Sequence, residues 1–259
     1  MSTVLVARQD AVALITLNRP EQRNALNGEM IGTLTETVAE LEGDDSIRAM
    51  VLTGADPAFC AGLDLRALAE GGGRFATTPG TGDRGPIGSL ATPLIGAVNG
   101  AAVTGGFELA LACHFLVASD RARFADTHAR VGIMPGWGLT VRLPERIGVT
   151  RAREMSFTGN FIDAPTALAW GLVNHVVSHE TLLTTALGLA ADIAGNDPVA
   201  VAQLGAIYDE GDAVGADPRW AIEHRTAGQM PGGFDAASMD ARRAAVIERG
   251  RQQTDSQKS

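Results

Sequence analysis

Lysine and cysteine are scarce in this sequence. The only lysine among the 21 Lys+Arg residues is Lys258, so no lysine stands where Schiff-base or P-loop phosphate chemistry would need one. The two cysteines, Cys60 and Cys113, lie inside apolar runs, which argues against a disulfide framework and predicts free thiols in a reducing compartment. Lysine-based catalysis and a disulfide scaffold are therefore poor explanations of this chain.

Positive charge is also in the minority. The 21 Lys+Arg residues face 30 Asp+Glu residues, and the net charge of -9 repels nucleic-acid phosphates and anionic membranes. Residues 1–12 show no basic start followed by a long apolar block, so we expect no signal peptide and a cytoplasmic protein. The charge-free run 86–107 is interrupted by prolines and glycines, and it fits a buried strand, a turn and a helix start better than a membrane span.

What the sequence does contain is enough apolar material for one large domain. It has 259 residues, of which 45% are hydrophobic and 20% charged. Strand and helix patterns alternate in the first half, which favours an α/β fold with crossover connections, and helical patterns dominate after residue 150. The expected strands are Val4–Arg8, Ala11–Leu17, Arg48–Thr53, Leu94–Val98, Phe115–Ala118 and Asn174–Val177. The expected helices are Glu29–Leu41, Gly105–Cys113, Arg151–Phe157, Pro165–Gly171, Thr181–Ala194, Val199–Tyr208, Pro218–Met230 and Asp235–Arg249.

A long glycine- and threonine-rich segment, Glu70–Gly88, has too few apolar residues to pack and is interpreted as a mobile loop. It contains Gly80-Thr81-Gly82-Asp83-Arg84-Gly85, which formally matches the dinucleotide fingerprint. No strand leads into this match, and a Rossmann site needs a strand, a glycine turn and a helix in that order. We therefore predict no dinucleotide cofactor.

Glu108 is the most informative single residue. It is the only Asp, Glu, Lys or Arg between Arg84 and Asp120, and it follows the pair Gly105-Gly106, where a buried strand gives way to a helix. Free backbone N–H groups and the positive helix end at such a point attract an anion, and a glutamate one turn into the helix can move protons. The alternative is that the glycines permit close packing and Glu108 caps its own helix.

A second turn has the same character. The strand ending at Thr53 runs through Phe59-Cys60-Ala61-Gly62 to Asp64, a predicted helix cap with free backbone N–H groups near it. Two such turns at the ends of neighbouring strands can direct two N–H donors at one carbonyl oxygen, which is an oxyanion hole. Periodicity alone does not prove that the turns meet.

These segments carry a resemblance that covers nearly the whole chain. Four motifs in order resemble the enoyl-CoA hydratase/isomerase (crotonase) family: Asn18-Arg19-Pro20 with Asn24-Ala25-Leu26-Asn27, Phe59-Cys60-Ala61-Gly62-Leu63-Asp64, Asn99-Gly100 through Gly105-Gly106-Phe107-Glu108-Leu109-Ala110, and Gly132-Ile133-Met134-Pro135-Gly136. The resemblance implies a crotonase-like spiral of repeated ββα units with a helical C-terminal region that builds homotrimers, often paired into hexamers. The expected division is an acyl-CoA-binding core over residues 1–195 and an oligomerisation region over 196–259.

The resemblance also implies the site. The substrate is an acyl-CoA thioester, so coenzyme A is part of the substrate, and we expect no separate cofactor and no metal. The backbone N–H groups of Ala61 and Gly105 are expected to hold the thioester oxygen, and Glu108 matches one of the two carboxylates of the family's hydratases. The remaining expected contacts to substrate or coenzyme are Arg23, Ala25, Gly62, Leu63, Asp64, Gly106 and Pro135. For Arg23 the alternative is a solvated surface arginine.

The second hydratase carboxylate is missing, because His128 occupies its place. An imidazole can exchange protons near neutral pH, and a catalytic His128 predicts a limb in the rate profile near pH 6.5, the ordinary histidine pKa. If residues 124–132 are extended, Asp126 and Arg130 share the face of His128, which is then a structural hydrogen-bond partner. Hydration of a 2-enoyl-CoA is the leading expectation; the alternatives are isomerisation, dehydration or decarboxylation with one base, and a non-catalytic acyl-CoA-binding subunit.

Three weaker features complete the candidates. Trp137 follows a Pro-Gly turn and either lines the acyl pocket or simply packs. His175 and His179 have a spacing that suits a metal on a helix, but their segment has a strand pattern and no third ligand. The resemblance also implies that the end of the chain contacts the coenzyme of a neighbouring copy, and the candidates there are Phe234, Arg242, Arg243, Arg249 and Arg251.

Overall fold

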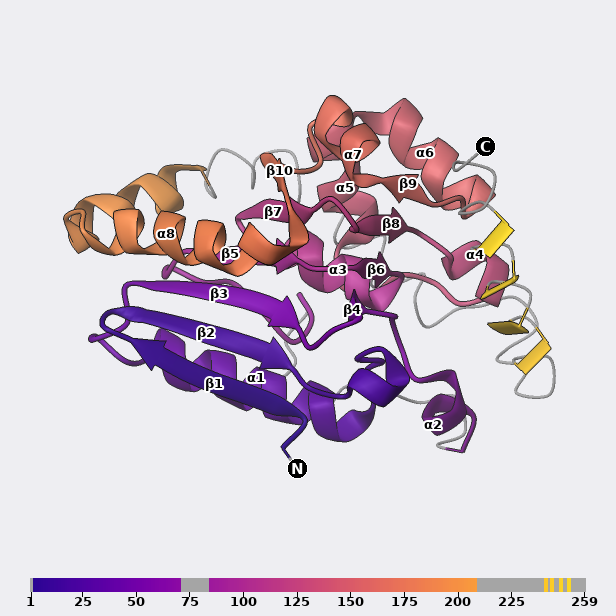
Figure 1. The fold of residues 1–259 in the computed structure, drawn as a ribbon, viewed down its shortest axis with the longest axis horizontal. Helices are drawn as coiled ribbons and strands as arrows, with labels where there is room; N and C mark the ends of the chain where they lie inside the picture. The colour runs from indigo at the N-terminus through magenta and orange to yellow at the C-terminus, as the bar shows by residue number, and fades with distance from the viewer. Residues whose placement is uncertain are drawn as a thin grey trace.

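The larger of two β-sheets begins with the expected hairpin (Figure 1). The structure, a computed structural model, describes residues 2–70 and 84–208, and residues 240, 241, 243, 244, 247, 248, 251 and 252. Strand β1 pairs with β2 in antiparallel fashion, and the remaining neighbours pair in parallel, in the order β1-β2-β3-β5-β7-β10. The strands are β1 (Val4–Gln9), β2 (Val12–Leu17), β3 (Ala49–Gly54), β5 (Leu94–Val98), β7 (Phe115–Ser119) and β10 (His175–Val177).

The smaller sheet is made of very short strands in the order β4-β6-β8-β9. Its members are β4 (Ala58–Cys60), β6 (Ala101–Val103), β8 (Arg123–Ala125) and β9 (Ile162–Asp163). Strands β4, β6 and β8 each follow directly on a strand of the larger sheet, namely β3, β5 and β7. The chain therefore turns a corner three times, at residues 55–57, 99–100 and 120–122, as it passes from one sheet to the other.

Each corner is followed by a helix, so the chain repeats a ββα unit. Helix α2 (Leu65–Glu70) follows β4, α3 (Gly105–Ala112) follows β6, and α4 (His128–Val131) follows β8. Because β4, β6 and β8 run parallel, their carboxyl ends lie on one side of the smaller sheet, and the three following helices begin there. This repetition is the crotonase-like α/β architecture expected from the motifs.

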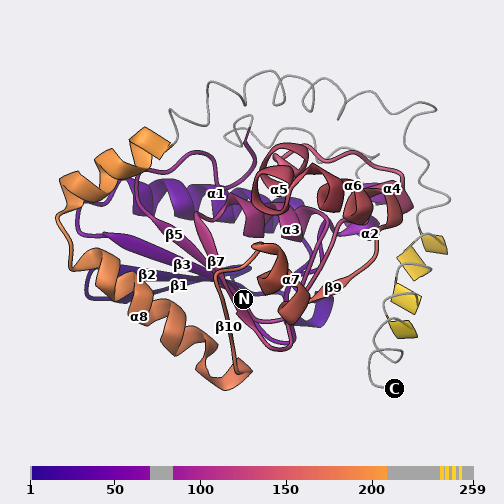
Figure 2. The same cartoon turned by 90° about the horizontal axis from the view of Figure 1, so that it is seen from above.

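Helices cover both faces of the larger sheet (Figures 1 and 2). Helix α1 (Gly28–Glu42) lies on one face and α8 (Leu182–Ala194) on the other. Apolar residues recur on α1 at helical spacing and are all buried: Met30, Ile31, Leu34, Val38 and Leu41. The Asn27 side chain accepts a hydrogen bond from the Met30 N–H and so caps the start of α1. The central strands β3 and β5 are thus buried on both sides, as their continuous apolar sequences require, whereas the edge strand β1 is mostly exposed.

The second half of the chain is mostly helical. It contains α5 (Leu139–Ile147), α6 (Val149–Thr158), α7 (Ala164–Trp170) and the 3-10 turn η2 (His179–Thr181), while another 3-10 turn, η1 (Pro20–Gln22), precedes α1. Residues 198–208 are helical, as are the eight described residues between 240 and 252. Within the described part of the chain, no helix combines the length and apolar character that crossing a bilayer requires.

The sequence predictions fail mainly at short elements. The turn predicted between the strand that ends at Thr53 and Asp64 contains β4, and the predictions omit β6, β8 and α5. The segment 124–132 is not extended throughout, because α4 begins at His128. Within the predicted loop Glu70–Gly88 and the glycine fingerprint it contains, residues 71–83 lie outside the described residues, as does the predicted helix Pro218–Met230. The division at residue 195 stays a prediction.

Candidate active site

Two turns of the chain come into direct contact. One joins β4 to α2, and the other joins β6 to α3. Gly62 in the first turn has φ +90°, and a Cβ atom there would lie 2.8 Å from the Val103 carbonyl oxygen and 3.5 Å from the Gly105 nitrogen. Only glycine accepts this backbone conformation and this close approach without strain. The convergence of the two turns, which periodicity could not establish, is therefore present.

The backbone donors at this junction differ from the expected pair. The Ala61 N–H donates to the Arg23 carbonyl oxygen at 3.0 Å, so this group is already used inside the protein. Expecting it to hold the thioester oxygen was wrong, because its partner comes from a tertiary contact. Two residues on, the Leu63 N–H has no acceptor among the described residues. On either side of it, the Gly62 carbonyl accepts from the Leu26 N–H, and the Asp64 N–H donates to the Leu26 carbonyl.

The donor expected from the second turn fits its role. Gly105 is the first residue of α3, and the helix's internal bonding begins only at the Glu108 N–H, which donates to the Thr104 carbonyl at 2.9 Å. The Gly105 N–H has no acceptor among the described residues, and it lies at the positive end of the helix dipole. A Cβ atom on Gly105 would lie 3.7 Å from Leu63 Cγ, so the two free donors are neighbours.

Glu108 is buried and held by the backbone of a distant segment. Its exposure is 3%, and its Oε1 accepts hydrogen bonds from the Gly136 N–H at 3.2 Å and the Trp137 N–H at 2.7 Å. These charge-assisted bonds fix one carboxylate oxygen and leave Oε2 to face other groups. Glu108 therefore does not cap its own helix, so that part of the alternative proposed from the sequence is wrong, although close packing at Gly106 is present.

His128 stands between two carboxylates. Its Nε2 lies 3.5 Å from Glu108 Oε2, and its Nδ1 lies 2.7 Å from Asp126 Oδ1, which also accepts from the His128 N–H at 3.1 Å. Asp126, His128 and Glu108 are 2%, 4% and 3% exposed. The interaction with Asp126 matches the structural role considered for His128, but the same ring also faces Glu108. Arg130, expected on the same face, instead donates to the Thr158 carbonyl.

The ionisation of this cluster follows from its contacts. Burial of the ring disfavours its charged form, but the hydrogen bond to Asp126 and the adjacent Glu108 carboxylate outweigh that effect and raise the pKa of His128 to about 9. Burial also acts to raise the pKa of Asp126, yet its hydrogen bonds to His128 and Ser156 lower it overall. His128 is therefore an imidazolium at neutral pH, and the limb that a catalytic His128 predicts in the rate profile is expected near pH 9 rather than pH 6.5.

A cleft of about 650 Å³ leads to these turns from the surface. Four of the predicted substrate contacts, Arg23, Ala25, Leu63 and Asp64, line it. Arg19 is tied to Asp64 at 3.0 Å and donates to the Ala25 carbonyl, so it holds the cleft wall in shape. The cations that line the cleft are Arg19, Arg23, Arg66, Arg243 and Arg251. Arg243 and Arg251 were among the candidates for contacts to a neighbouring copy's coenzyme, and here they line the cleft of their own chain.

The other predicted contacts have packing roles in this structure. A Cβ atom on Gly106 would lie 2.2 Å from the Cys60 carbonyl oxygen, so glycine lets α3 approach β4. Gly62 allows the contact between the turns, and Pro135 is buried just before Gly136, which binds Glu108. None of these three residues is among the described residues that line the cleft.

The two cysteines are both buried. Burial raises the pKa of both Cys60 and Cys113 to about 12, so neither thiol ionises at neutral pH. The described residues hold no group of three or more His, Cys, Asp or Glu side chains arranged for a metal ion.

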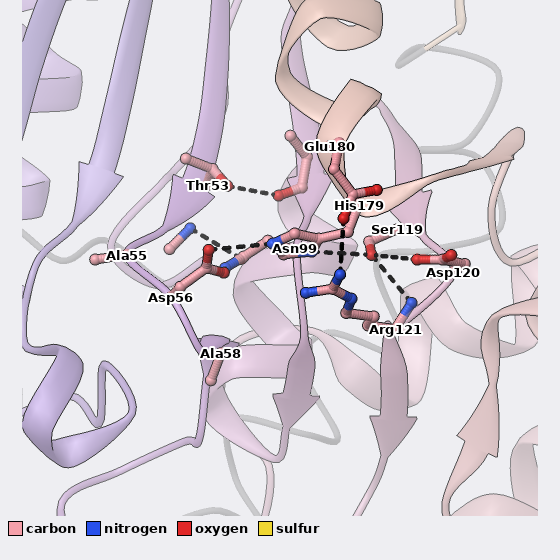
Figure 3. A network of polar contacts seen from close by, with 12 residues as sticks. Thr53, Ala55, Asp56, Ala58, Asn99, Ser119, Asp120, Arg121, His179 and Glu180 are labelled. Carbon is pink, nitrogen blue, oxygen red and sulfur yellow. Dashed lines mark hydrogen bonds and ion pairs between the residues drawn. The ribbon is translucent and has the colours of Figure 1, made fainter.

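A second histidine cluster joins the three corners between the sheets (Figure 3). His179 Nε2 lies 3.1 Å from Asp56 Oδ2, and its Nδ1 lies 3.2 Å from Ser119 Oγ. The Asn99 side chain donates to Asp56 at 2.9 Å and accepts from the Gly54 N–H at 3.3 Å. His179 is thus a side-chain partner of two corners, while His175 is exposed on β10.

This fold, with its paired backbone donors and buried acid, defines a class of enzymes that act on activated acyl groups. The profile of the enoyl-CoA hydratase/isomerase family matches residues 7–222, and the chain belongs to this family. It is 40% identical over 200 residues to an Arabidopsis thaliana protein named "Probable enoyl-CoA hydratase 1, peroxisomal", a match covering 77% of this chain and 76% of the relative. It is 41% identical over 201 residues to carnitinyl-CoA dehydratase of Proteus mirabilis, covering 76% and 77%. The solved structure of an enoyl-CoA hydratase from Mycobacterium tuberculosis H37Rv superimposes with TM-score 0.80 at 45% identity, covering 88% and 97%.

Proposed function

We propose that this protein hydrates a 2-enoyl-CoA reversibly, adding water across the double bond conjugated with the thioester. The observation that carries this proposal is the array Asp126–His128–Glu108 beside two free backbone N–H donors. Hydration needs a base for water and an acid for the α-carbon, and the array supplies a carboxylate and an imidazolium 3.5 Å apart. Relatives named enoyl-CoA hydratase support the same reaction.

The thioester oxygen is held by the N–H groups of Leu63 and Gly105. As water attacks the β-carbon, electrons move onto this oxygen and an enolate forms, and two preorganised donors stabilise that charge. The contribution of one such donor is about 10²-fold or more in rate. The positive end of α3 acts in the same direction, because Gly105 is its first residue.

The proton balance uses both sides of the array. Glu108 Oε2 takes a proton from water as the oxygen bonds to the β-carbon, and His128 Nε2 gives its proton to the α-carbon. Glu108 is then neutral and His128 is neutral, and a proton transfer from Oε2 to Nε2 across 3.5 Å restores both charges. Asp126 keeps the ring oriented by its bond to Nδ1.

The cleft is the proposed coenzyme A site. Its arginines offer planar cations to phosphate oxygens, and Arg23 lies at its rim where a diphosphate can reach it. Coenzyme A enters as part of the substrate, so the proposed reaction needs no further cofactor. The cytoplasm is the proposed compartment, because the two cysteines, Cys60 and Cys113, are both free thiols, as a reducing compartment would keep them.

We also propose a homotrimer or a pair of trimers. Large apolar side chains stand exposed on α6 and on the helical segment 198–208, including Phe157 at 78% and Tyr208 at 74%. Apolar surface of this kind favours burial between copies. Light scattering on the full chain tests this, and a monomer at micromolar concentration would contradict it.

Substrate assays test the reaction. With crotonyl-CoA, loss of the conjugated-thioester absorbance marks hydration, whereas a 3-enoyl-CoA that gains absorbance marks isomerisation. A carnitinyl-CoA dehydratase among the relatives makes a hydroxyacyl-CoA the third substrate to try. Binding of all three without turnover would contradict catalysis and indicate an acyl-CoA-binding subunit.

A further inference from the structure

The indole of Trp137 lies between two glycines, Gly105 and Gly85. A Cβ atom on Gly105 would be 3.3 Å from Trp137 Cζ3, and a Cβ atom on Gly85 would be 2.7 Å from Trp137 Cγ. The edge of the six-membered ring therefore packs against the residue that offers the second oxyanion donor. The segment at Gly85 covers the other end of the side chain, so the indole is held from both sides.

The backbone of the same residue holds the catalytic carboxylate. The Trp137 N–H donates to Glu108 Oε1 at 2.7 Å, and this is the shorter of the two backbone bonds to that oxygen. The position of the indole is consequently coupled to the position of Glu108. The indole therefore keeps a fixed place relative to the carboxylate that activates the water in the proposed reaction.

The direction of the acyl chain follows from the thioester geometry. The sulfur and the α-carbon are bonded to the carbonyl carbon on opposite sides. When the coenzyme occupies the cleft on the sulfur side, the acyl group therefore extends away from the cleft. The cleft reaches Leu63, Val103 and Thr104, and Trp137 is not among the described residues that line it. With the oxygen on Leu63 and Gly105, the acyl carbons therefore run toward the indole that contacts Gly105.

We infer that Trp137 is a specificity-determining residue that limits the acyl group to short chains, an inference that rests on the proposed function. A long chain would have to displace an indole that is packed against Gly105 and covered at Gly85. Protein interiors are close-packed, so moving a packed side chain aside costs free energy. Crotonyl-CoA is the representative short substrate, and 2-decenoyl-CoA is the representative long one.

The test compares kcat/KM for crotonyl-CoA and 2-decenoyl-CoA in the wild type, Trp137→Ala and Trp137→Leu. Each substitution keeps the backbone N–H on Glu108, so the carboxylate retains its bond. We expect the wild type to prefer crotonyl-CoA, and Trp137→Ala to shift the ratio toward 2-decenoyl-CoA by at least about tenfold, with a smaller shift for Trp137→Leu. A wild type that prefers 2-decenoyl-CoA, or an unchanged ratio in folded Trp137→Leu, would overturn the inference.

A matched control and a binding measurement separate the two proposals. Trp170, whose ring stacks with the Arg151 guanidinium at 5.3 Å, lies outside the site, and Trp170→Ala should leave the ratio unchanged. An equal shift in that variant would mean general loosening and would overturn the inference. Calorimetry with butyryl-CoA and decanoyl-CoA, which cannot be hydrated, reads chain length without turnover. If butyryl-CoA binds more tightly than decanoyl-CoA but crotonyl-CoA is not hydrated, the proposed reaction is rejected and the inference about chain length is supported. If crotonyl-CoA is hydrated but decanoyl-CoA binds more tightly, the reaction is supported and the inference is overturned.

Discussion

Two histidine clusters in this protein contain the same kinds of groups and differ in almost everything else. His128 lies between Asp126 and Glu108 at the carboxyl side of the short strands, and all three residues are at most 4% exposed. His179 lies between Asp56 and Ser119 at the corners where those strands begin, and the Asp56 side chain is 63% exposed. A three-residue strand separates the two levels by about 10 Å.

The contrast teaches that neighbours and solvent, rather than residue type, decide which histidine can do chemistry. At His128 two buried carboxylates leave the imidazolium as the compensating charge, because an unpaired buried carboxylate is costly. At His179 water reaches Asp56, and burial acts to raise the pKa of that carboxyl, while hydrogen bonds from Asn99 and His179 lower it overall. The His128 cluster therefore carries a proton that can be transferred, next to the free backbone donors. The His179 cluster connects the three corners by hydrogen bonds.

Removal of the base should produce the largest effect. We expect Glu108→Gln to lower kcat for crotonyl-CoA hydration by about 10² to 10⁴-fold, because the amide cannot accept a proton from water. Binding of butyryl-CoA should largely survive, since the donors at Leu63 and Gly105 remain. Steady-state kinetics and calorimetry measure the two quantities, and unchanged turnover would remove Glu108 from the mechanism.

The second largest effect concerns the charge on His128. Its raised pKa of about 9 predicts that kcat falls as pH rises through about 9, and that His128→Gln removes this limb and lowers kcat about 10²-fold. The free energy of unfolding should also fall as pH rises through this range. The pKa rises from 6.5 on folding, so the stabilisation is complete below pH 6.5 and is lost as pH rises through about 9.

Rate profiles and urea midpoints between pH 6 and pH 10 check both statements. An unaltered rate and profile in His128→Gln would rule out acid–base catalysis by this residue. Glu108 would then be the sole proton carrier, which favours a one-base reaction over hydration.

The reach of the sequence can be judged at these same residues. The hairpin, the strand Leu94–Val98 and the placement of Glu108 early in a helix were all confirmed, since long apolar runs and a lone charge are local signals. The strands β4, β6 and β8 were missed, because three residues are too few to display a period and parallel pairing with distant segments holds them. Leu63 rather than Ala61 offers the free backbone donor because the Ala61 N–H donates to the Arg23 carbonyl, more than thirty residues away. No sequence pattern predicts that pairing.

A smaller effect should come from Asp126, which positions His128 without facing the reacting atoms. Asp126→Asn keeps an oxygen near Nδ1 but removes the charge that helps hold the proton on the ring. We expect the limb in the rate profile to move from about pH 9 toward pH 6.5, so that kcat at pH 8 falls about tenfold while kcat at pH 6 changes little. A purely structural role would lower kcat equally at both pH values and leave the limb in place.

The smallest effect on rate should come from the corner cluster. We expect His179→Ala to change kcat by less than about twofold and to lower the free energy of unfolding by about 1 kcal/mol. The imidazole is a shared partner, but each corner keeps bonds of its own, from Asn99 to Asp56 and from the Arg121 N–H to Ser119 Oγ. Urea unfolding and crotonyl-CoA kinetics on the same preparation check both values. A tenfold loss of kcat with unchanged stability would contradict the purely structural role of His179, because it would mean that the corners position the catalytic turns.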